Sequence, residues 1–218
     1  MQFNGFSEET GEFLWGIAFN NEKPWFEAHR EQFVRAVKDP LDALAREVLA
    51  LTEAKHPDDG YRVHISRIHR DARRLFGRGP YKDHLWFTLW SNAGDDNGPA
   101  FWFEVGPATY SYGVGFYCAK PGQMDAFRRY VDANPAETER LVKRVARLGY
   151  TLDGEEYKRP KKDVGPVLNP WYNRKFLALS KTFDHGGEFY TAELPAVLAA
   201  SYEELMPVYE LLCRFVTP

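Results

Sequence analysis

The 218-residue sequence has little cysteine, no long uncharged apolar run and almost no excess of charge of either sign. Its two cysteines, Cys118 and Cys213, exclude a disulfide framework of the kind that holds small secreted domains together. No apolar run reaches the roughly 18 residues that a membrane-spanning helix needs, and no basic segment precedes an apolar core at the N-terminus. These absences predict a soluble protein, which we expect in the cytoplasm, with no membrane partner.

The composition is that of a folded domain. Hydrophobic residues make up 44% of the chain and charged residues 27%, which excludes both disorder and a collagen-like fibre. A chain of this length buries roughly 70% of its unfolded surface, so it needs no metal to fold. No internal repeat or linker is evident, and we therefore predict a single globular domain over residues 1–218.

The order of the predicted elements indicates an α+β fold. Helical spacing of apolar residues fills the first quarter and returns after residue 120, whereas the middle alternates apolar and polar residues as a strand does. Short connections favour antiparallel pairing, so we expect a mostly antiparallel sheet of four or more strands with helices before and after it. The expected strands are Tyr61–Ser66, Leu85–Trp90, Ala100–Val105 and Tyr110–Cys118, and the expected helices include Pro24–Lys38, one starting at Asp39, Gln123–Asp132, Pro135–Leu148, Trp171–Leu179 and Leu194–Phe215.

Positive charge is concentrated in two segments. Residues 62–84 hold seven basic residues against two acids, and residues 143–162 hold seven against three. Because the chain as a whole has a net charge of −3, these local segments favour an anionic ligand over a long nucleic-acid track.

The first basic segment supplies the candidate binding residues. Alternation places Arg67 at the end of the apolar row Tyr61, Val63 and Ile65, so we expect it to be half-buried, with Asp71 as its carboxylate partner. One acid cannot neutralise all the neighbouring cations, and the surplus predicts a pocket for a phosphate- or carboxylate-bearing small molecule. The predicted ligand-binding residues are Arg67, Arg70, Asp71, Arg73, Tyr81 and Lys82.

Other interpretations of this segment stay open. The arginines could bind nucleic acid together with exposed aromatic side chains, or they could form a structural Arg–Asp network in an interaction or scaffold protein. A metal site built from His69, Asp71 and a distant residue such as His185 is disfavoured, because the flanking arginines repel a cation. We predict no metal site. The sequence assigns no cofactor, no catalytic residue and no oligomeric state, and it does not decide whether the protein is an enzyme.

The chain resembles a bacterial family catalogued as a domain of unknown function, whose members carry an R-x-x-R-D-x-R-F motif and a downstream D-K-x-x-Y-K. The residues that carry the resemblance are Arg67-x-x-Arg70-Asp71-x-Arg73 and Pro80-Tyr81-Lys82, with further similarity at 20–26, 113–117 and 158–160. The chain departs from the pattern at Arg74, Gly77 and Arg78, where the family has Phe, Asp and Lys. The resemblance implies one intact domain and does not imply a reaction.

Overall fold

The computed structural model describes residues 2–71, 73, 75, 77–93, 98–116 and 119–216. Cys118, at the end of one predicted strand, and Arg74, one of the departures from the family pattern, lie outside these ranges. The chain forms two compact units. Unit 1 comprises Met1–Leu89, Trp102–Ser111 and Thr182–Ala200, and unit 2 comprises Trp90–Phe101, Tyr112–Lys181 and Ser201–Pro218.

A six-stranded sheet in the order β1-β2-β3-β4-β6-β5 confirms the α+β prediction. The strands are β1 (Arg62–Ile65), β2 (Leu85–Trp90), β3 (Ala100–Val105), β4 (Thr109–Gly115), β5 (Thr151–Asp153) and β6 (Ala178–Asp184). Strands β2 and β3 have the predicted bounds, and each alternates between a buried and a half-buried residue along its length. Four strands contribute residues to both units: β2, β3, β4 and β6. That the whole chain is a single domain stays a prediction.

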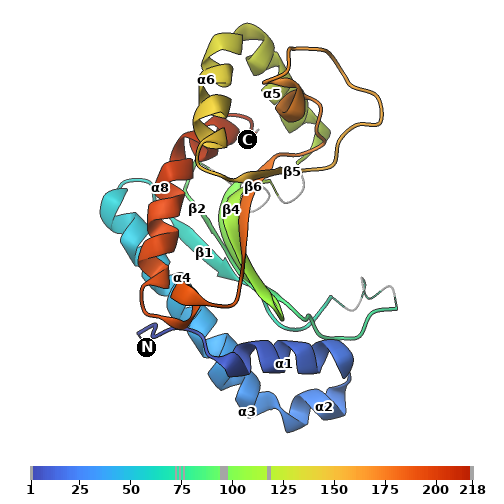
Figure 1. The fold of residues 1–218 in the computed structure, drawn as a ribbon, viewed down its shortest axis with the longest axis vertical. Coiled ribbons are helices and arrows are strands. Elements are labelled where there is room, and N and C mark those ends of the chain that lie inside the picture. Colours follow the sequence, from blue (N-terminus) through green and yellow to red (C-terminus); the bar gives the residue numbers. More distant parts are fainter. Residues whose placement is uncertain are drawn as a thin grey trace. The chain divides into compact units, whose positions relative to one another are not determined.

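Helices α1 (Glu8–Phe19), α2 (Lys23–Ala28), α3 (Arg30–Phe33) and α4 (Asp39–Lys55) precede the sheet, and α1 packs beside α3 within unit 1 (Figure 1). The N-terminus of α1 is capped at Ser7, whose backbone N–H donates to Thr10 Oγ1 at 3.3 Å. The core of this unit is aromatic, because the ring of Phe6 stacks on both Phe103 and Phe189, with centroids 6.0 and 4.6 Å away.

The predicted helix Pro24–Lys38 is not continuous. It divides at His29 into α2 and α3, and a π-helical turn, η1 (Val34–Lys38), then joins α3 to α4 without a break. The turn is π-helical because the N–H of Asp39 reaches back five residues to the carbonyl of Val34. The pattern of apolar residues predicted a helix here correctly, but it did not predict this change of hydrogen bonding.

Unit 2 contains α5 (Pro121–Ala133), α6 (Pro135–Ala146), the short α7 (Asn169–Tyr172) and most of α8 (Leu194–Cys213); η3 (Gly187–Tyr190) is a 3₁₀ turn in unit 1. A buried guanidinium holds the loop before β6, since Arg128 Nε donates to the carbonyl of Tyr172 at 3.0 Å and Nη2 to that of Arg174 at 2.9 Å. The predicted helix Trp171–Leu179 is wrong beyond Tyr172, because from Ala178 the chain pairs as β6 with β5 instead.

Candidate functional site

The first basic segment forms an irregular two-stranded structure in unit 1, which we call the basic ribbon (residues 67–71 and 78–83). His69 and Tyr81 form an antiparallel bridge, the N–H of Arg70 donates to the carbonyl of Pro80 at 2.8 Å, and the N–H of Lys82 donates to that of Ile68 at 2.8 Å. The two halves of the segment, about a dozen residues apart in sequence, are therefore held against each other by backbone hydrogen bonds.

Asn21, which follows α1, attaches the basic ribbon to the helices. Its side chain accepts from the N–H of Tyr81 at 2.8 Å and donates to the carbonyl of Tyr81 at 2.9 Å. Gly79 allows this approach, because a Cβ at that position would lie 2.2 Å from Asn21 Oδ1. Asn21 thus anchors the ribbon to the end of α1.

The structure corrects the predicted environment of Arg67, whose side chain is exposed. The strand alternation is lost at Ser66. Its hydroxyl Oγ accepts from the N–H of Trp86 at 3.0 Å, and its own N–H donates to the carbonyl of Trp86 at 2.8 Å. Ser66 and Ile68 are buried, so the inward positions beyond β1 are even-numbered and Arg67 points outward.

Asp71 also has a different partner from the one predicted. Its carboxylate accepts from Arg73 through the backbone N–H at 3.0 Å, Nε at 3.0 Å and Nη2 at 2.8 Å. The side chain of Arg73 is 87% exposed. The pair is local because Asp71 caps a turn two residues long, and at this exposure it contributes little to stability.

Arg70 is the structural cation of the basic ribbon. Its side chain is only 14% exposed, Nε donates to the carbonyl of Tyr81 at 2.7 Å, and Nη2 lies 3.1 Å from Asp83 Oδ1. Tyr81 itself is buried and stacks on Phe26, with ring centroids 4.4 Å apart. Tyr81 therefore positions Arg70 through its backbone, and burial raises the pKa of its hydroxyl.

Lys82 lies among cations. Its ammonium donates to the carbonyl of Arg67 and sits 4.5 Å from the centre of the Trp86 ring. Burial lowers the pKa of Lys82, and the neighbouring charges of Arg70 and Arg67 lower it further. No carboxylate among the described residues forms an ion pair with Lys82 or Arg67. Of these three cations, Arg70 is paired with Asp83, whereas Arg67 and Lys82 carry positive charge with no carboxylate partner among the described residues.

Asp83, at the end of the basic ribbon, and His84 and Glu104, beside it, were not predicted as site residues. His84 Nδ1 lies 2.9 Å from Asp83 Oδ1, and the His84 ring stacks on Trp86 with centroids 5.7 Å apart. Burial raises the pKa of the Glu104 carboxyl, an effect that Asp83 reinforces and His84 opposes. The sequence did hold a signal for Glu104, which is the one acid in an otherwise apolar, aromatic strand.

The charges around Asp83 explain its own acidity. Burial by itself would raise the pKa of Asp83, but the hydrogen bond with His84 and the charge of Arg70 outweigh burial and lower it. Asp83 is therefore an anion that holds two side chains, Arg70 and His84, in fixed positions.

The basic ribbon lies within a region of the chain that matches a known protein family. The family model for the conserved hypothetical proteins DUF2461 matches residues 9–211, which include every residue of the basic ribbon as well as His84 and Glu104. The chain belongs to this family. No curated protein matches it.

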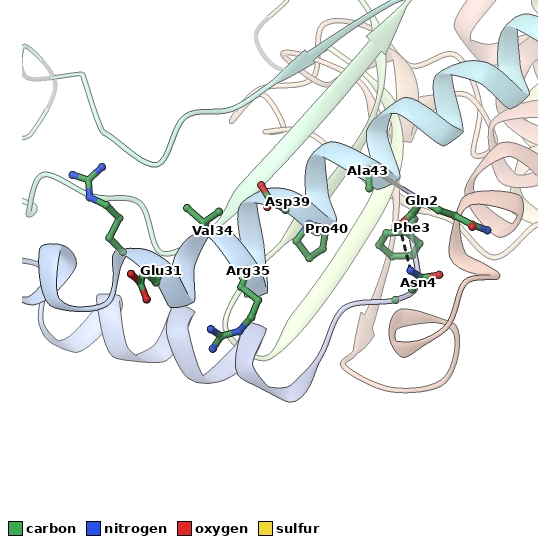
Figure 2. A pocket seen from close by; sticks show the side chains of 11 residues that line it. Gln2, Phe3, Asn4, Glu31, Val34, Arg35, Asp39, Pro40 and Ala43 are labelled. Atoms are coloured by element: carbon green, nitrogen blue, oxygen red, sulfur yellow. Dashed lines mark hydrogen bonds between the residues drawn. The ribbon is translucent and has the colours of Figure 1, made fainter.

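In this DUF2461 chain, unit 1 also has an open groove of about 500 Å³ between the N-terminal segment and the run α3–η1–α4 (Figure 2). Phe3, Val34 and Pro40 line it, and charged side chains surround it. Both arginines at the groove are already paired, Arg30 with Glu27 at 2.7 Å and Arg35 with Glu9 at 2.9 Å. The groove is therefore a weaker candidate for an anion than the basic ribbon.

The remaining predictions concern metals and membranes. Within the described ranges, no group of three or more His, Cys, Asp and Glu side chains could hold a metal ion. His69, from the metal site considered above, packs against the rings of Phe26 and Tyr81, whereas His185 stacks on Phe189 at 4.2 Å. None of the described helices is both long and apolar enough to span a bilayer.

Proposed function

We propose that this DUF2461 protein binds an anionic small molecule, bearing a phosphate or carboxylate, at the basic ribbon. One observation carries the proposal: Arg67, Arg70 and Lys82 lie together on the basic ribbon, with the Lys82 ammonium against the carbonyl of Arg67, and of the three only Arg70 has a carboxylate partner among the described residues. Unneutralised cations near one another destabilise a folded protein unless an anion binds between them.

The roles of the predicted residues follow from their contacts. Arg67 and Lys82 contact the anion, and Arg70 adds its charge from a fixed position. Tyr81 acts as a support for Arg70. Asp71 and Arg73 neutralise each other at the edge of the site, so their contribution to binding is small.

Binding of inorganic phosphate by the full-length protein tests this proposal. We expect phosphate to raise the melting temperature and to bind with a single-site isotherm in calorimetry, because a ligand of the native state stabilises it. Arg67→Ala should weaken phosphate binding by about 10-fold or more, since a hydrogen bond to a charged group is lost. Arg73→Ala is the matched control, because its guanidinium is held by Asp71, and it should change the affinity by less than about 2-fold.

Three further results would contradict the proposal. The first is no stabilisation by phosphate or by citrate, which leaves the arginines with a structural role in a scaffold protein. The second is an equal effect of the Arg67 and Arg73 variants. The third is tight binding of a single-stranded oligonucleotide that weakens steeply with salt while phosphate has no effect, which favours the nucleic-acid interpretation.

The proposal also includes the cellular location of the protein. It assigns the protein to the bacterial cytoplasm, and cell fractionation followed by immunodetection tests that assignment. The resemblance to a bacterial family and the composition support it, while the site itself is compatible with any compartment.

A further inference from the structure

On β2 and β3, next to the basic ribbon, one sheet face is half-buried and carries both aromatic side chains and the carboxyl group of Glu104. Phe87 of β2 and Phe103 of β3 stack with centroids 5.6 Å apart, so both lie on the buried face of the sheet. Side chains alternate along a strand, and Trp86 and Glu104 therefore share the opposite, half-buried face. His84 joins that face because its ring stacks on Trp86.

Asp83 fixes how the His84 imidazole can move protons. A carboxylate that accepts a hydrogen bond at Nδ1 keeps the proton on that nitrogen, so the neutral ring presents an unprotonated Nε2. The carboxylate is itself fixed by Arg70. His84 is 37% exposed, so a water molecule can reach Nε2 from solvent.

Glu104, unlike His84, is suited to donate a proton. No described residue forms a hydrogen bond with its carboxyl group, and burial favours the protonated form. A hydrogen-bonded imidazole and a carboxyl group without a hydrogen-bond partner among the described residues thus occur on one sheet face, beside three cations.

From this arrangement we propose that the site hydrolyses a phosphate monoester, with His84 as general base and Glu104 as general acid. The proposal rests on the anion-binding function above and adds a reaction to it. The groups that face His84 are Asp83, Arg70, Lys82 and Glu104, and no metal ion is invoked.

The proposed step balances with water as the only co-reactant. His84 Nε2 takes one proton from water as the water oxygen bonds to phosphorus. The bond from phosphorus to the ester oxygen breaks, and that oxygen takes the proton of the Glu104 carboxyl group and leaves as an alcohol. Arg67 and Lys82 stabilise the charge on the other phosphate oxygens. The proton on His84 then returns to Glu104 through solvent, which regenerates the site.

Two aryl phosphates separate the roles of the two residues. The full-length protein should release phosphate from both p-nitrophenyl phosphate and phenyl phosphate. His84→Gln should lower kcat for both by roughly 10²-fold or more. Glu104→Gln should lower kcat strongly for phenyl phosphate and little for p-nitrophenyl phosphate, because nitrophenolate leaves without a proton. The matched control is His64→Gln, an exposed histidine on β1 that should leave both rates unchanged.

Asp83 is a positioning residue in this proposal, and a pH profile tests it. Asp83→Asn should lower kcat and shift the acidic limb of the pH–rate profile, where the general base becomes protonated, since His84 loses the carboxylate that fixes its tautomer. A purely structural role for Asp83 would change stability without moving the profile.

The failures of the two proposals are distinguishable. If phosphate binds and Arg67→Ala weakens it, but neither ester is hydrolysed above the His84→Gln background, the anion site stands and the hydrolase is rejected. Equal losses for both esters in Glu104→Gln also reject the proposed acid. If phosphate does not bind at all, both proposals fail together.

Discussion

At the scale of single residues, the site shows how one carboxylate can organise several neighbours. Asp83 accepts hydrogen bonds from a nearly buried guanidinium and from an imidazole, and its lowered pKa keeps it charged for both. Asp71, only twelve positions earlier, forms an equally short pair with Arg73, yet exposure makes that pair weak. The two carboxylates are about equally exposed, so it is the burial of the arginine partner, 14% exposed for Arg70 and 87% for Arg73, that separates the two pairs.

Glu104 provides a prediction at this scale. Its pKa is raised, so the folded state holds this proton more tightly than the unfolded state does, and the associated stability is present at low pH and lost as pH rises through the folded pKa. Glu104→Gln removes the cost of the charged carboxylate and should increase the free energy of unfolding at pH 7 more than at pH 4. Urea denaturation at both pH values measures this difference, and an equal or opposite change would contradict it.

At the scale of elements, the sheet was easier to predict than its edges. Strands β2 and β3 were placed correctly because buried and half-buried residues alternate throughout them. Arg67 was misplaced because the hydroxyl of Ser66 replaces a backbone acceptor, and one such substitution reverses the inside and outside of every later residue. Rules based on residue propensity do not predict a side-chain hydroxyl that replaces a backbone acceptor.

The missed residues of the site have a similar explanation. Asp83 and His84 are neighbours in sequence, and no spacing rule marks adjacent polar residues as a pair. Strand β6 was missed since its first residues, Ala178 to Ser180, are short of a full alternating pattern and gain their strand structure from pairing with β5. Local sequence does not predict pairing between segments that are far apart in the chain.

Helix α8 offers a matched pair of tyrosines for a second prediction. Tyr202 and Tyr209 both stack on Phe101, with centroids 4.8 and 4.7 Å away. Among the described residues, the hydroxyl of Tyr209 has a partner, Ser91, and that of Tyr202 has none. Tyr209→Phe should lower the free energy of unfolding by about 1–2 kcal/mol, because the N–H of Ser91 loses its acceptor. Tyr202→Phe should be neutral or stabilising, because a buried hydroxyl without a partner among the described residues is removed.

Chemical denaturation of both variants measures this difference directly. The paired design keeps ring stacking and burial nearly constant, so the comparison isolates the hydrogen bond. Equal destabilisation by the two substitutions would show that the Tyr202 hydroxyl has a partner in solution, such as a buried water.

At the scale of the whole molecule, the two compact units are not independent segments of the chain. Four strands pass from one unit into the other, so no single cut in the chain separates them. We expect unfolding to be one cooperative transition. Far-ultraviolet circular dichroism and tryptophan fluorescence should give the same urea midpoint, since coincident probes indicate two-state behaviour.

Trp86 of unit 1 and Trp171 of unit 2 supply a control for that experiment. Trp171→Phe leaves four tryptophans in unit 1 and one in unit 2, whereas Trp86→Phe leaves three in unit 1 and two in unit 2. The two signals weight the units differently, and the midpoints that they report should agree after correction for any change in stability. Two separated midpoints would show that the units unfold one after the other and would contradict the prediction of a single domain.

The π-helical turn has a consequence for changes in chain length. The turn Val34–Lys38 contains one more residue than an α-helical turn would need, and the helix on either side of it is regular. A natural or engineered deletion of one residue inside the turn can therefore be absorbed by converting it to α-helix, with Leu41, Leu44 and Val48 still facing inward. A one-residue deletion inside α4 cannot be absorbed in this way. It would rotate the rest of the helix by about 100° around the helix axis.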